Sequence, residues 1–245
     1  MNWDIFFEIH KDLPREGSGR DEYTQKAFEM IPKIIQPNIL DIGCGPGLQT
    51  IKLAKLSNGK ITAIDIHQPY LDQLEKHTKE EKLSDRINIL NKSMINMDFS
   101  EEEFDIIWAE GSIFIIGFEK GIIEWKKFIK QGGFLAIHEM TWLRDNPPKE
   151  ISDFWQRVYP QISTIDNNLE IIRKCGYKFL GHFPLPEDAW WEFYYNPLEK
   201  RLKMLEKKYK NNPETLGMIR GEYEEIDLFR KYNKWYGSVF YIMQK

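Results

Sequence analysis

The chain has 245 residues, 42% of them hydrophobic and 14% aromatic, which is enough for one globular domain with a sizeable core. Its formal net charge of −4 argues against a nucleic-acid partner, because proteins that neutralise phosphates usually carry a basic stripe. No apolar stretch approaches the roughly 20 residues that span a bilayer, and the first residues do not resemble a secretory signal. Cys44 and Cys175 show neither a disulfide framework nor metal-ligand spacing. We therefore expect a cytoplasmic protein with no membrane, nucleic-acid or metal partner.

Over the first 140 residues or so, short apolar runs that predict strands alternate with segments of helical periodicity, as in βα units of a mostly parallel sheet. Five strands are expected, at residues 39–42, 61–64, 87–90, 104–108 and 134–137. The helix before the fifth strand should present Ile122, Trp125 and Ile129 inward. It should stop at Gly132–Gly133, because glycine tolerates the left-handed backbone that ends many helices.

The last third of the chain departs from this alternation. A helix should end at Gly176, and residues 177–183 and 238–242 predict two more strands. A final strand that follows no regular βα step is expected to be antiparallel. Between these strands the basic residues of 200–210 accompany apolar residues at helical spacing, which indicates a solvated helix face rather than a phosphate-binding surface. The apolar residues are Leu198, Leu202, Leu205 and Tyr209.

The strongest functional signal is Ile-Leu-Asp-Ile-Gly-Cys-Gly-Pro-Gly at residues 39–47. Glycines after a buried strand let the chain turn sharply and let a ligand approach the bare backbone. The helix that follows would point its free N–H groups into the same crevice. Tight structural turns also use glycine, so this run alone indicates no more than a nucleotide-like ligand.

Three details refine that interpretation. A dinucleotide fingerprint requires a further glycine where this chain has Leu48. Asp41, two residues before Gly43, would repel a pyrophosphate but attract a cationic amino-acid group. Asp65 follows the second strand and is suitably placed to accept both hydroxyls of a ribose, or else to cap the next helix. Together these residues favour a nucleoside that carries an ammonium group and no phosphate.

Residues 39–47 resemble the first motif of class I S-adenosylmethionine-dependent methyltransferases, Asp-x-Gly-x-Gly-x-Gly between a strand and a helix. The resemblance implies S-adenosylmethionine as the cofactor and assigns its methionine part to the glycine turn, its ribose to the second strand end and its adenine to the third. The corresponding positions are Asp41, Gly43, Cys44, Gly45, Gly47, Asp65, Ile66, Ser93 and Met94.

The resemblance also implies a Rossmann-like α/β fold. Its seven-stranded, mostly parallel sheet has the order 3-2-1-4-5-7-6, an antiparallel last strand, helices on both faces and a helical lid. No repeat or Gly/Ser linker interrupts the chain, so we expect a single domain over residues 1–245. Its expected parts are an N-terminal lid or helix, a cofactor-binding core and two helical substrate-lid segments, at residues 1–35, 36–145, 146–176 and 185–235.

The segment after the fourth strand, residues 104–112, is similar to the small-molecule branch of the family. It lacks the Asn/Asp-Pro-Pro-Tyr of enzymes that methylate exocyclic amines of nucleic acids. Residues 13–19 and 111–118 are more narrowly similar to an uncharacterised prokaryotic group, to which we attach no substrate.

Candidates for acid–base chemistry lie at the ends of strands four and five, above the expected cofactor. His138 is either a base with a pKa near the ordinary value of about 6.5 or a structural histidine; Glu139 lies beside it. Glu110 would either contact the cofactor and hold a substrate cation or bond the backbone of residues 111–118. Residues 15–19 would either fold over the cofactor, with Arg15 pairing to its carboxylate, or form a flexible entry loop.

Aromatic residues gather in the expected lid. They would enclose an apolar ring or a methylated ammonium group, or else simply pack the lid onto the sheet. The members are Trp155, Tyr159, Trp190, Trp191, Tyr194 and Tyr195, of which we assign Trp155, Trp190, Trp191 and Tyr194 to the substrate.

The resulting hypothesis is in-line methyl transfer from S-adenosylmethionine to an N, O, S or C nucleophile of a small molecule, by a monomer or a homodimer. A non-catalytic sensor of S-adenosylmethionine or S-adenosylhomocysteine and, less favoured, a nicotinamide-dependent oxidoreductase are the alternatives.

Overall fold

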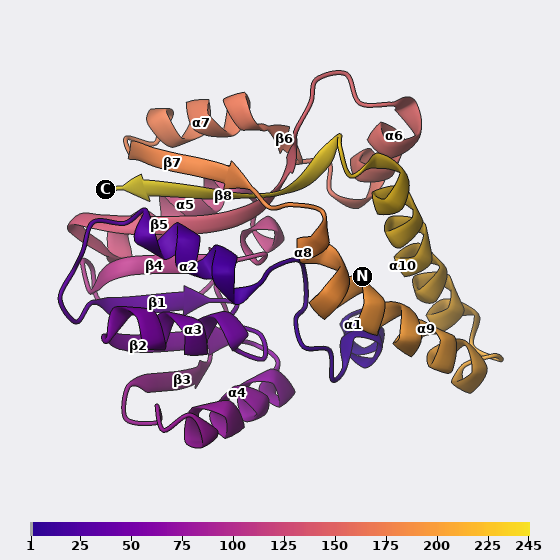
Figure 1. The fold of residues 1–245 in the computed structure, drawn as a ribbon, viewed down its shortest axis with the longest axis horizontal. Coiled ribbons are helices and arrows are strands. Elements are labelled where there is room, and N and C mark those ends of the chain that lie inside the picture. The colour runs from indigo at the N-terminus through magenta and orange to yellow at the C-terminus, as the bar shows by residue number, and fades with distance from the viewer. Residues whose placement is uncertain (1) are drawn as a thin grey trace.

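A mixed β-sheet forms the centre of the computed structural model, which describes residues 2–245 (Figure 1). The sheet order is β3-β2-β1-β4-β5-β8-β7, and the short β6 pairs with β5 off this path. β8 runs antiparallel to β5 and β7, and the other pairs are parallel. The strands are β1 (Asn38–Ile42), β2 (Lys60–Asp65), β3 (Ile87–Asn91), β4 (Phe104–Glu110), β5 (Ile129–Trp142), β6 (Ser163–Thr164), β7 (Lys178–Pro184) and β8 (Tyr236–Gln244). The predicted fold and strand order are confirmed, with the two-residue β6 as an addition.

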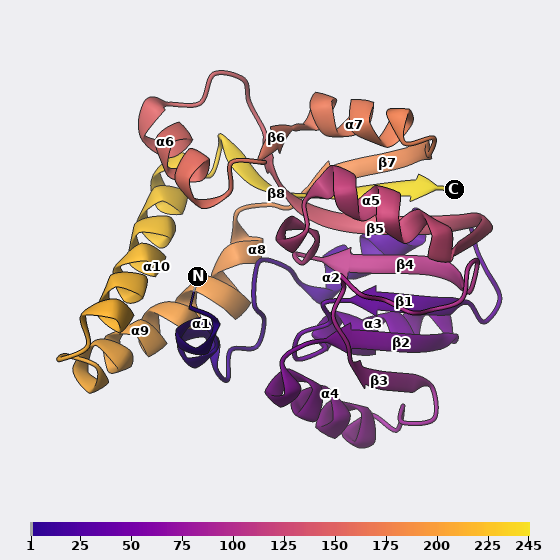
Figure 2. The same cartoon turned by 180° about the vertical axis from the view of Figure 1, so that it is seen from behind.

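Helices cover both faces of the sheet. α2, α3 and α4 pack with the lid on one face, and α5 and α7 pack on the other, which Figure 2 shows from behind. The α-helices are α1 (Trp3–His10), α2 (Asp21–Glu29), α3 (Leu48–Ser57), α4 (Gln68–Glu80), α5 (Phe118–Trp125), α6 (Lys149–Val158), α7 (Ile165–Lys174), α8 (Asp188–Trp190), α9 (Asn196–Lys208) and α10 (Pro213–Tyr232). Short turns are the 3₁₀ segments η1 (Ile113–Ile115) and η2 (Lys126–Phe128) and the π-helical η3 (Trp191–Tyr195).

The prediction for the helix before β5 was wrong at its end. α5 finishes at Trp125, and Ile129 begins β5 instead of continuing the helix. Ile129 pairs with Phe104, and the register of β4 and β5 then shifts before Ile106 pairs with Phe134. Gly132–Gly133 lie inside this irregular stretch, because glycine also suits a bulge in a strand.

The lid of α6, α8, α9 and α10 lies beyond the C-terminal ends of the parallel strands, and α1 packs against α9 and α10 (Figure 1). α7 does not belong to it: it packs against α5 and β7 on the sheet, so the predicted lid segment 146–176 is too long at its C-terminal end. The reason is that Leu169 and Ile172 are buried in the core on that face. Met1, the first residue of the expected segment 1–35, lies outside the described residues.

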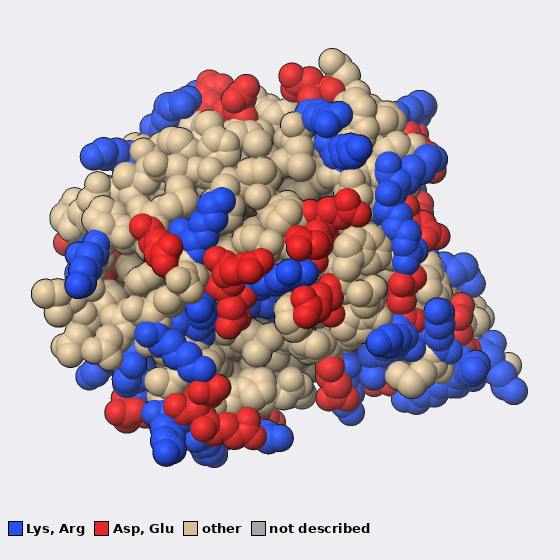
Figure 3. Space-filling view, in the orientation of Figure 1, with Lys and Arg blue, Asp and Glu red and all other residues tan. Residues whose placement is uncertain are grey.

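The surface carries both signs of charge. Acidic and basic side chains are interspersed over the face in Figure 3. α9 buries Leu198, Leu202 and Leu205 and leaves its lysines exposed, as their helical spacing predicts. No helix within residues 2–245 combines the length and apolar character that crossing a bilayer requires.

Candidate active site

The glycine turn between β1 and α3 forms the floor of the site. Gly43, Gly45 and Gly47 all have positive φ, at 70°, 51° and 87°. A Cβ on Gly43 would lie 2.5 Å from the Ser112 Cβ, and one on Gly47 would lie 2.2 Å from the Leu74 Cδ1, so packing within the protein already requires these two glycines. At Gly45 the nearest atom would be the Glu16 Cγ at 3.8 Å, an ordinary contact. Gly45 is therefore where the backbone of the turn has room for a ligand.

Two carboxylates flank this turn. Asp41 is fully buried; its Oδ2 accepts a 2.6 Å hydrogen bond from Thr50 Oγ1, while Oδ1 has no partner among the described residues. Burial raises the pKa of Asp41 to about 7, although the Thr50 hydrogen bond lowers it in part. Asp65 accepts bonds from the backbone N–H of Gly45 at 3.0 Å and of His67 at 2.9 Å. Asp65 thus holds the glycine turn to His67, the residue preceding α4, rather than bonding an N–H group within the helix.

Residues 15–19, which we call the strap, cross over this floor. Arg15 Nη1 lies 3.3 Å from Glu110 Oε2, and the two side chains are only 7% and 5% exposed. Glu110 also accepts hydrogen bonds from Thr24 Oγ1 at 2.7 Å and Trp108 Nε1 at 2.9 Å. These contacts correct the expectation for Glu110: its carboxylate binds side chains of its own chain, not the backbone of residues 111–118. They also give Arg15 an internal partner, because a buried guanidinium needs a carboxylate close by.

Two further strap residues, Ser18 and Glu16, contact β5, β8 and the glycine turn. Ser18 Oγ lies 2.8 Å from Ser238 Oγ and 3.5 Å from His138 Nε2. Glu16 lies over Gly45, and both of its carboxylate oxygens are buried without a partner in residues 2–245. Burial raises the pKa of Glu16 to about 8, and the negative charge of Asp65 raises it further.

His138 is buried and stacks on Phe240, with 5.0 Å between the ring centroids. Burial lowers its pKa to about 3, and the positive charge of Arg15 acts in the same direction. Of the two alternatives for His138, the lowered pKa favours the structural histidine over the base, because desolvation disfavours the charged ring. Glu139 is buried beside it, and burial raises its pKa to about 8.

Met94, one of the residues expected to contact the adenine, also lies at the glycine turn that forms the floor of the site. The Met94 Cε would be 3.5 Å from a Cβ on Gly43, so this methionine packs against the turn. Ser93 Oγ accepts a hydrogen bond from the Ile95 N–H. Cys44 is fully buried, whereas Ile66 is 54% exposed.

Comparison with known proteins decides the family. Residues 39–133, which contain the glycine turn and run into β5, match the family model described as a methyltransferase domain. This part of the chain is therefore similar to a methyltransferase domain. The predicted family is confirmed, since the sheet order and the glycine turn also agree with it.

Curated relatives match this chain over only part of their own length. The sterol 24-C-methyltransferase ERG6B of Gibberella zeae is 25% identical over 152 residues, which cover 59% of this chain and 40% of that protein. The methyltransferase GfsG of Streptomyces halstedii is 23% identical over 165 residues, covering 65% and 59%. The chain thus spans less than two thirds of the length of either relative.

Solved methyltransferase structures match nearly the whole chain in fold. A S-adenosylmethionine-dependent methyltransferase from Thiobacillus denitrificans, in complex with S-adenosylhomocysteine, has a TM-score of 0.82 at 16% identity and covers 98% of this chain and 97% of that one. The cyclase SpnF has a TM-score of 0.74 at 19% identity, covering 99% and 92%. A cyclase on this fold shows that shared architecture alone does not determine the reaction.

The predicted substrate residues lie in two places. Trp190 packs against Tyr194 and Tyr195 at the start of α9. The ring centroids of Trp190 and Tyr195 lie 5.4 Å apart. Trp155 lies on α6 and contacts Tyr236, with 5.1 Å between the ring centroids. Trp191 is half-buried beneath the Arg230 guanidinium at 5.0 Å. Trp155 and Trp190 pack within the core, as the alternative interpretation stated.

Several polar residues near the strap had no sequence signal. They lie on α1, α4 and α10 and include two acids within the charged run Glu222-Tyr223-Glu224-Glu225, which is typical of a solvated helix face. These residues are His10, Tyr70, Glu222 and Glu225.

The raised carboxyl pKa values predict how stability changes with pH. Asp41 and Glu16 keep protons in the folded state up to about pH 7 and 8, whereas the unfolded chain releases them near pH 4. The unfolded state therefore binds fewer protons, and these two groups should lower the free energy of unfolding by about 2 kcal/mol as pH rises from 6.5 to 8. Glu139 and Glu222, whose pKa values are also raised to about 8 by burial, should add to that fall. His138 does not oppose this fall strongly, because its lowered pKa matters chiefly below its ordinary value of 6.5. Urea denaturation at both pH values measures it, and unchanged or rising stability would contradict the prediction.

Proposed function

We propose that the chain is a S-adenosylmethionine-dependent methyltransferase that acts on a small molecule. The observation that carries this is the Gly45 backbone, where an added Cβ would meet only the flexible Glu16 side chain, at 3.8 Å, and which has carboxylates on either side. Asp41 offers a buried oxygen without a partner in the described chain, which suits a cationic group. A pyrophosphate would meet the charges of Asp41, Asp65 and Glu16, which argues against a nicotinamide dinucleotide.

Different residues of the site would hold different parts of the cofactor. Gly43, Gly45, Cys44 and Asp41 would hold the amino-acid part of the cofactor, and Asp65 its ribose. When bound, the cofactor supplies an activated methyl group on a sulfonium. The strap excludes water from the turn, and the Arg15–Glu110 ion pair keeps it in place. Glu16 and Glu139, rather than His138, have pKa values suited to accepting a proton near neutrality.

The cellular setting and the acceptor class belong to the same proposal. Cys44 and Cys175 are free thiols, which supports a reducing, cytoplasmic environment. The acceptor is a small molecule and not a nucleic acid, and the chain works as a single domain over residues 1–245, as a monomer or a homodimer.

Thermal unfolding with four ligands tests the cofactor. At a concentration of about 100 times the dissociation constant, S-adenosylmethionine and S-adenosylhomocysteine should each stabilise the protein by about 2.7 kcal/mol, and NAD and NADP should not. A shift with NAD or NADP alone would refute the proposal, and so would the absence of any shift. Stabilisation without methyl transfer to any small acceptor would favour a sensor, or the kind of non-methylating activity that the name of SpnF indicates.

A further inference from the structure

Acidic and aromatic side chains meet inside the lid, beside the strap. His10 Nε2 on α1 lies 3.9 Å from Glu222 Oε2 on α10, and the His10 ring stacks near Tyr194, with 6.2 Å between centroids. One helical turn along α10, Glu225 accepts a 3.0 Å hydrogen bond from the Tyr195 hydroxyl. The charge of Glu16 in the strap also raises the pKa values of Glu222 and Tyr194. We call these residues the lid cluster.

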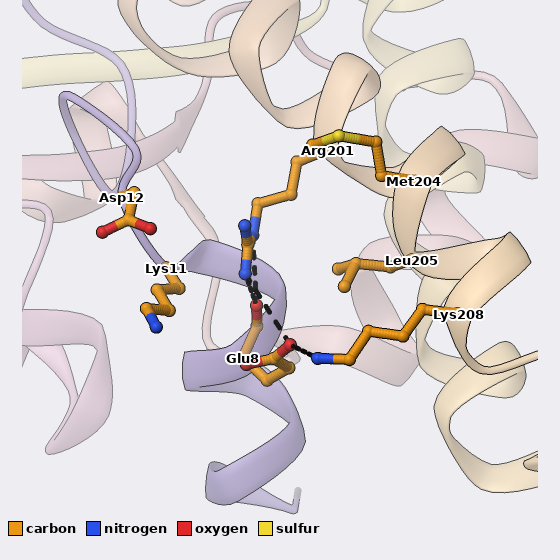
Figure 4. A pocket seen from close by; sticks show the side chains of 7 residues that line it. All are labelled: Glu8, Lys11, Asp12, Arg201, Met204, Leu205 and Lys208. Carbon is orange, nitrogen blue, oxygen red and sulfur yellow. Dashed lines mark hydrogen bonds and ion pairs between the residues drawn. The ribbon is translucent and has the colours of Figure 1, made fainter.

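Hydrogen bonds from a residue outside the lid cluster fix the position of α1. Arg201 on α9 donates hydrogen bonds to the carbonyl oxygens of Glu8 and Ile9, at 3.1 and 2.8 Å from its Nε. Figure 4 shows Arg201 reaching Glu8 across a groove of about 280 Å³, with Lys208 on the same carboxylate. The Arg201 guanidinium is thus bound to the end of α1. None of the acids of the lid cluster lines the groove.

The negative charges of the lid cluster lack a cation. His10 Nδ1 lies 3.0 Å from the Phe6 carbonyl oxygen, which can only accept, so Nδ1 carries the proton and Nε2 presents a lone pair. Burial lowers the pKa of His10 to about 4, so the ring is neutral. No lysine or arginine among residues 2–245 forms an ion pair with Glu16, Glu222 or Glu225.

Buried hydroxyls without partners face the same acids. Tyr70 is 5% exposed and its hydroxyl faces the Glu16 carboxyl, although the two groups do not reach full hydrogen-bond geometry in the described part of the chain. The Tyr236 hydroxyl is also buried and unpartnered within residues 2–245, and Glu225 acts on it. Polar groups buried without partners cost free energy, so they indicate a site that a ligand completes.

The aromatic wall of the cluster depends on the π-helical turn η3. In an α-helix, consecutive residues point about 100° apart. Here Tyr194 and Tyr195 are both buried, with 4.9 Å between their ring centroids. π-helical turns are rare and occur frequently at functional sites. This turn brings two tyrosine rings to one acidic cluster.

We propose that the lid cluster binds the positively charged group of an amine-bearing acceptor, with Glu222 and Glu225 as its counter-charges and Tyr194 as its aromatic wall. This rests on the proposed methyltransferase function. An ammonium group would give the two carboxylates the partner that the protein lacks, through charge-assisted hydrogen bonds and cation–π contact. A neutral alcohol or an anionic acid would leave them unpaired. Glu16 continues the acidic lining from this cluster to Gly45, towards the methyl donor.

Calorimetric titration tests this with matched probes, in the presence of saturating S-adenosylhomocysteine. 2-Phenylethylamine and butylamine should bind, and 2-phenylethanol and 1-butanol, which have the same carbon skeletons without the charge, should bind at least tenfold more weakly. Because burial raises the pKa of Glu222 to about 8, amine binding at pH 7 should also release protons into the buffer. Repeating the titration in buffers of different ionisation enthalpy measures that release.

Three variants localise the effect. Glu222→Gln and Glu225→Gln should each weaken amine binding at least tenfold and reduce proton release. Glu224→Gln, on the same helix but exposed and paired with Arg157, should leave both unchanged. Equal affinity for amines and alcohols, indifference of amine binding to both variants, or no amine binding would each overturn the proposal. S-adenosylhomocysteine binding is measured separately, so its loss would refute the methyltransferase function instead.

Discussion

Replacing Gly45 with arginine should abolish binding of S-adenosylhomocysteine while the protein stays folded. Gly45 has φ of 51° and space above it, so the new side chain enters the crevice and its guanidinium meets Glu16 and Asp65. The left-handed backbone costs a non-glycine residue about 1–2 kcal/mol, which a domain of this size can tolerate. Affinity should fall at least about 100-fold, or ~2.7 kcal/mol. Calorimetric titration gives the affinity, and circular dichroism reports whether the fold is kept.

Gly217→Arg is the matched control. Gly217 is exposed on α10, where nothing but the Arg220 side chain lies within 4 Å of an added Cβ. A glycine-to-arginine change in an exposed helix should be neutral or stabilise the fold by up to about 1 kcal/mol, and it should leave cofactor binding intact. If Gly45→Arg bound S-adenosylhomocysteine like the control, the cofactor would have to bind away from the glycine turn.

Replacing Glu110 with alanine should lower the free energy of unfolding by about 3–5 kcal/mol, because it leaves the Arg15 guanidinium buried without its closest carboxylate. The change also deprives Thr24 Oγ1 and Trp108 Nε1 of their acceptor. Urea denaturation at pH 7 measures the loss. The strap should become accessible in the same variant, so proteolysis within residues 15–19 should accelerate.

An exposed ion pair provides the comparison. Lys149 and Asp153 are four residues apart on α6, and both are well exposed. Asp153→Ala should change stability by no more than about 0.5 kcal/mol, because solvent screens such pairs. A loss below 1 kcal/mol for Glu110→Ala would mean that Arg15 finds another partner, Asp21 being the nearest at 3.4 Å, and that the strap does not depend on Glu110.

Local sequence was sufficient for the core of the fold because strands and turns leave a periodic or glycine-rich pattern. β1, the turn at 43–47 and α3 follow directly from an apolar run, three glycines and a helical segment. The same information failed at Ile129, which has helical spacing after Trp125 but lies in a strand. There the pairing of Ile129 with Phe104 of β4 outweighed local periodicity, since pairing depends on residues that are remote in the sequence.

The strands of the core and the identity of the turn were determined by the sequence itself, because each depends on neighbouring residues along the chain. The family and the sheet order followed from the resemblance of residues 39–47 to a known motif, since strand pairing joins remote residues. Only the tertiary structure decided the state of the charged groups. It brought Arg15 to Glu110 across 95 positions and buried His138, and it placed Glu222 and Glu225 of an ordinary-looking acidic run beside His10 and Tyr195. A pKa or an ion pair depends on what lies within a few ångströms in space, and distance along the chain does not encode that.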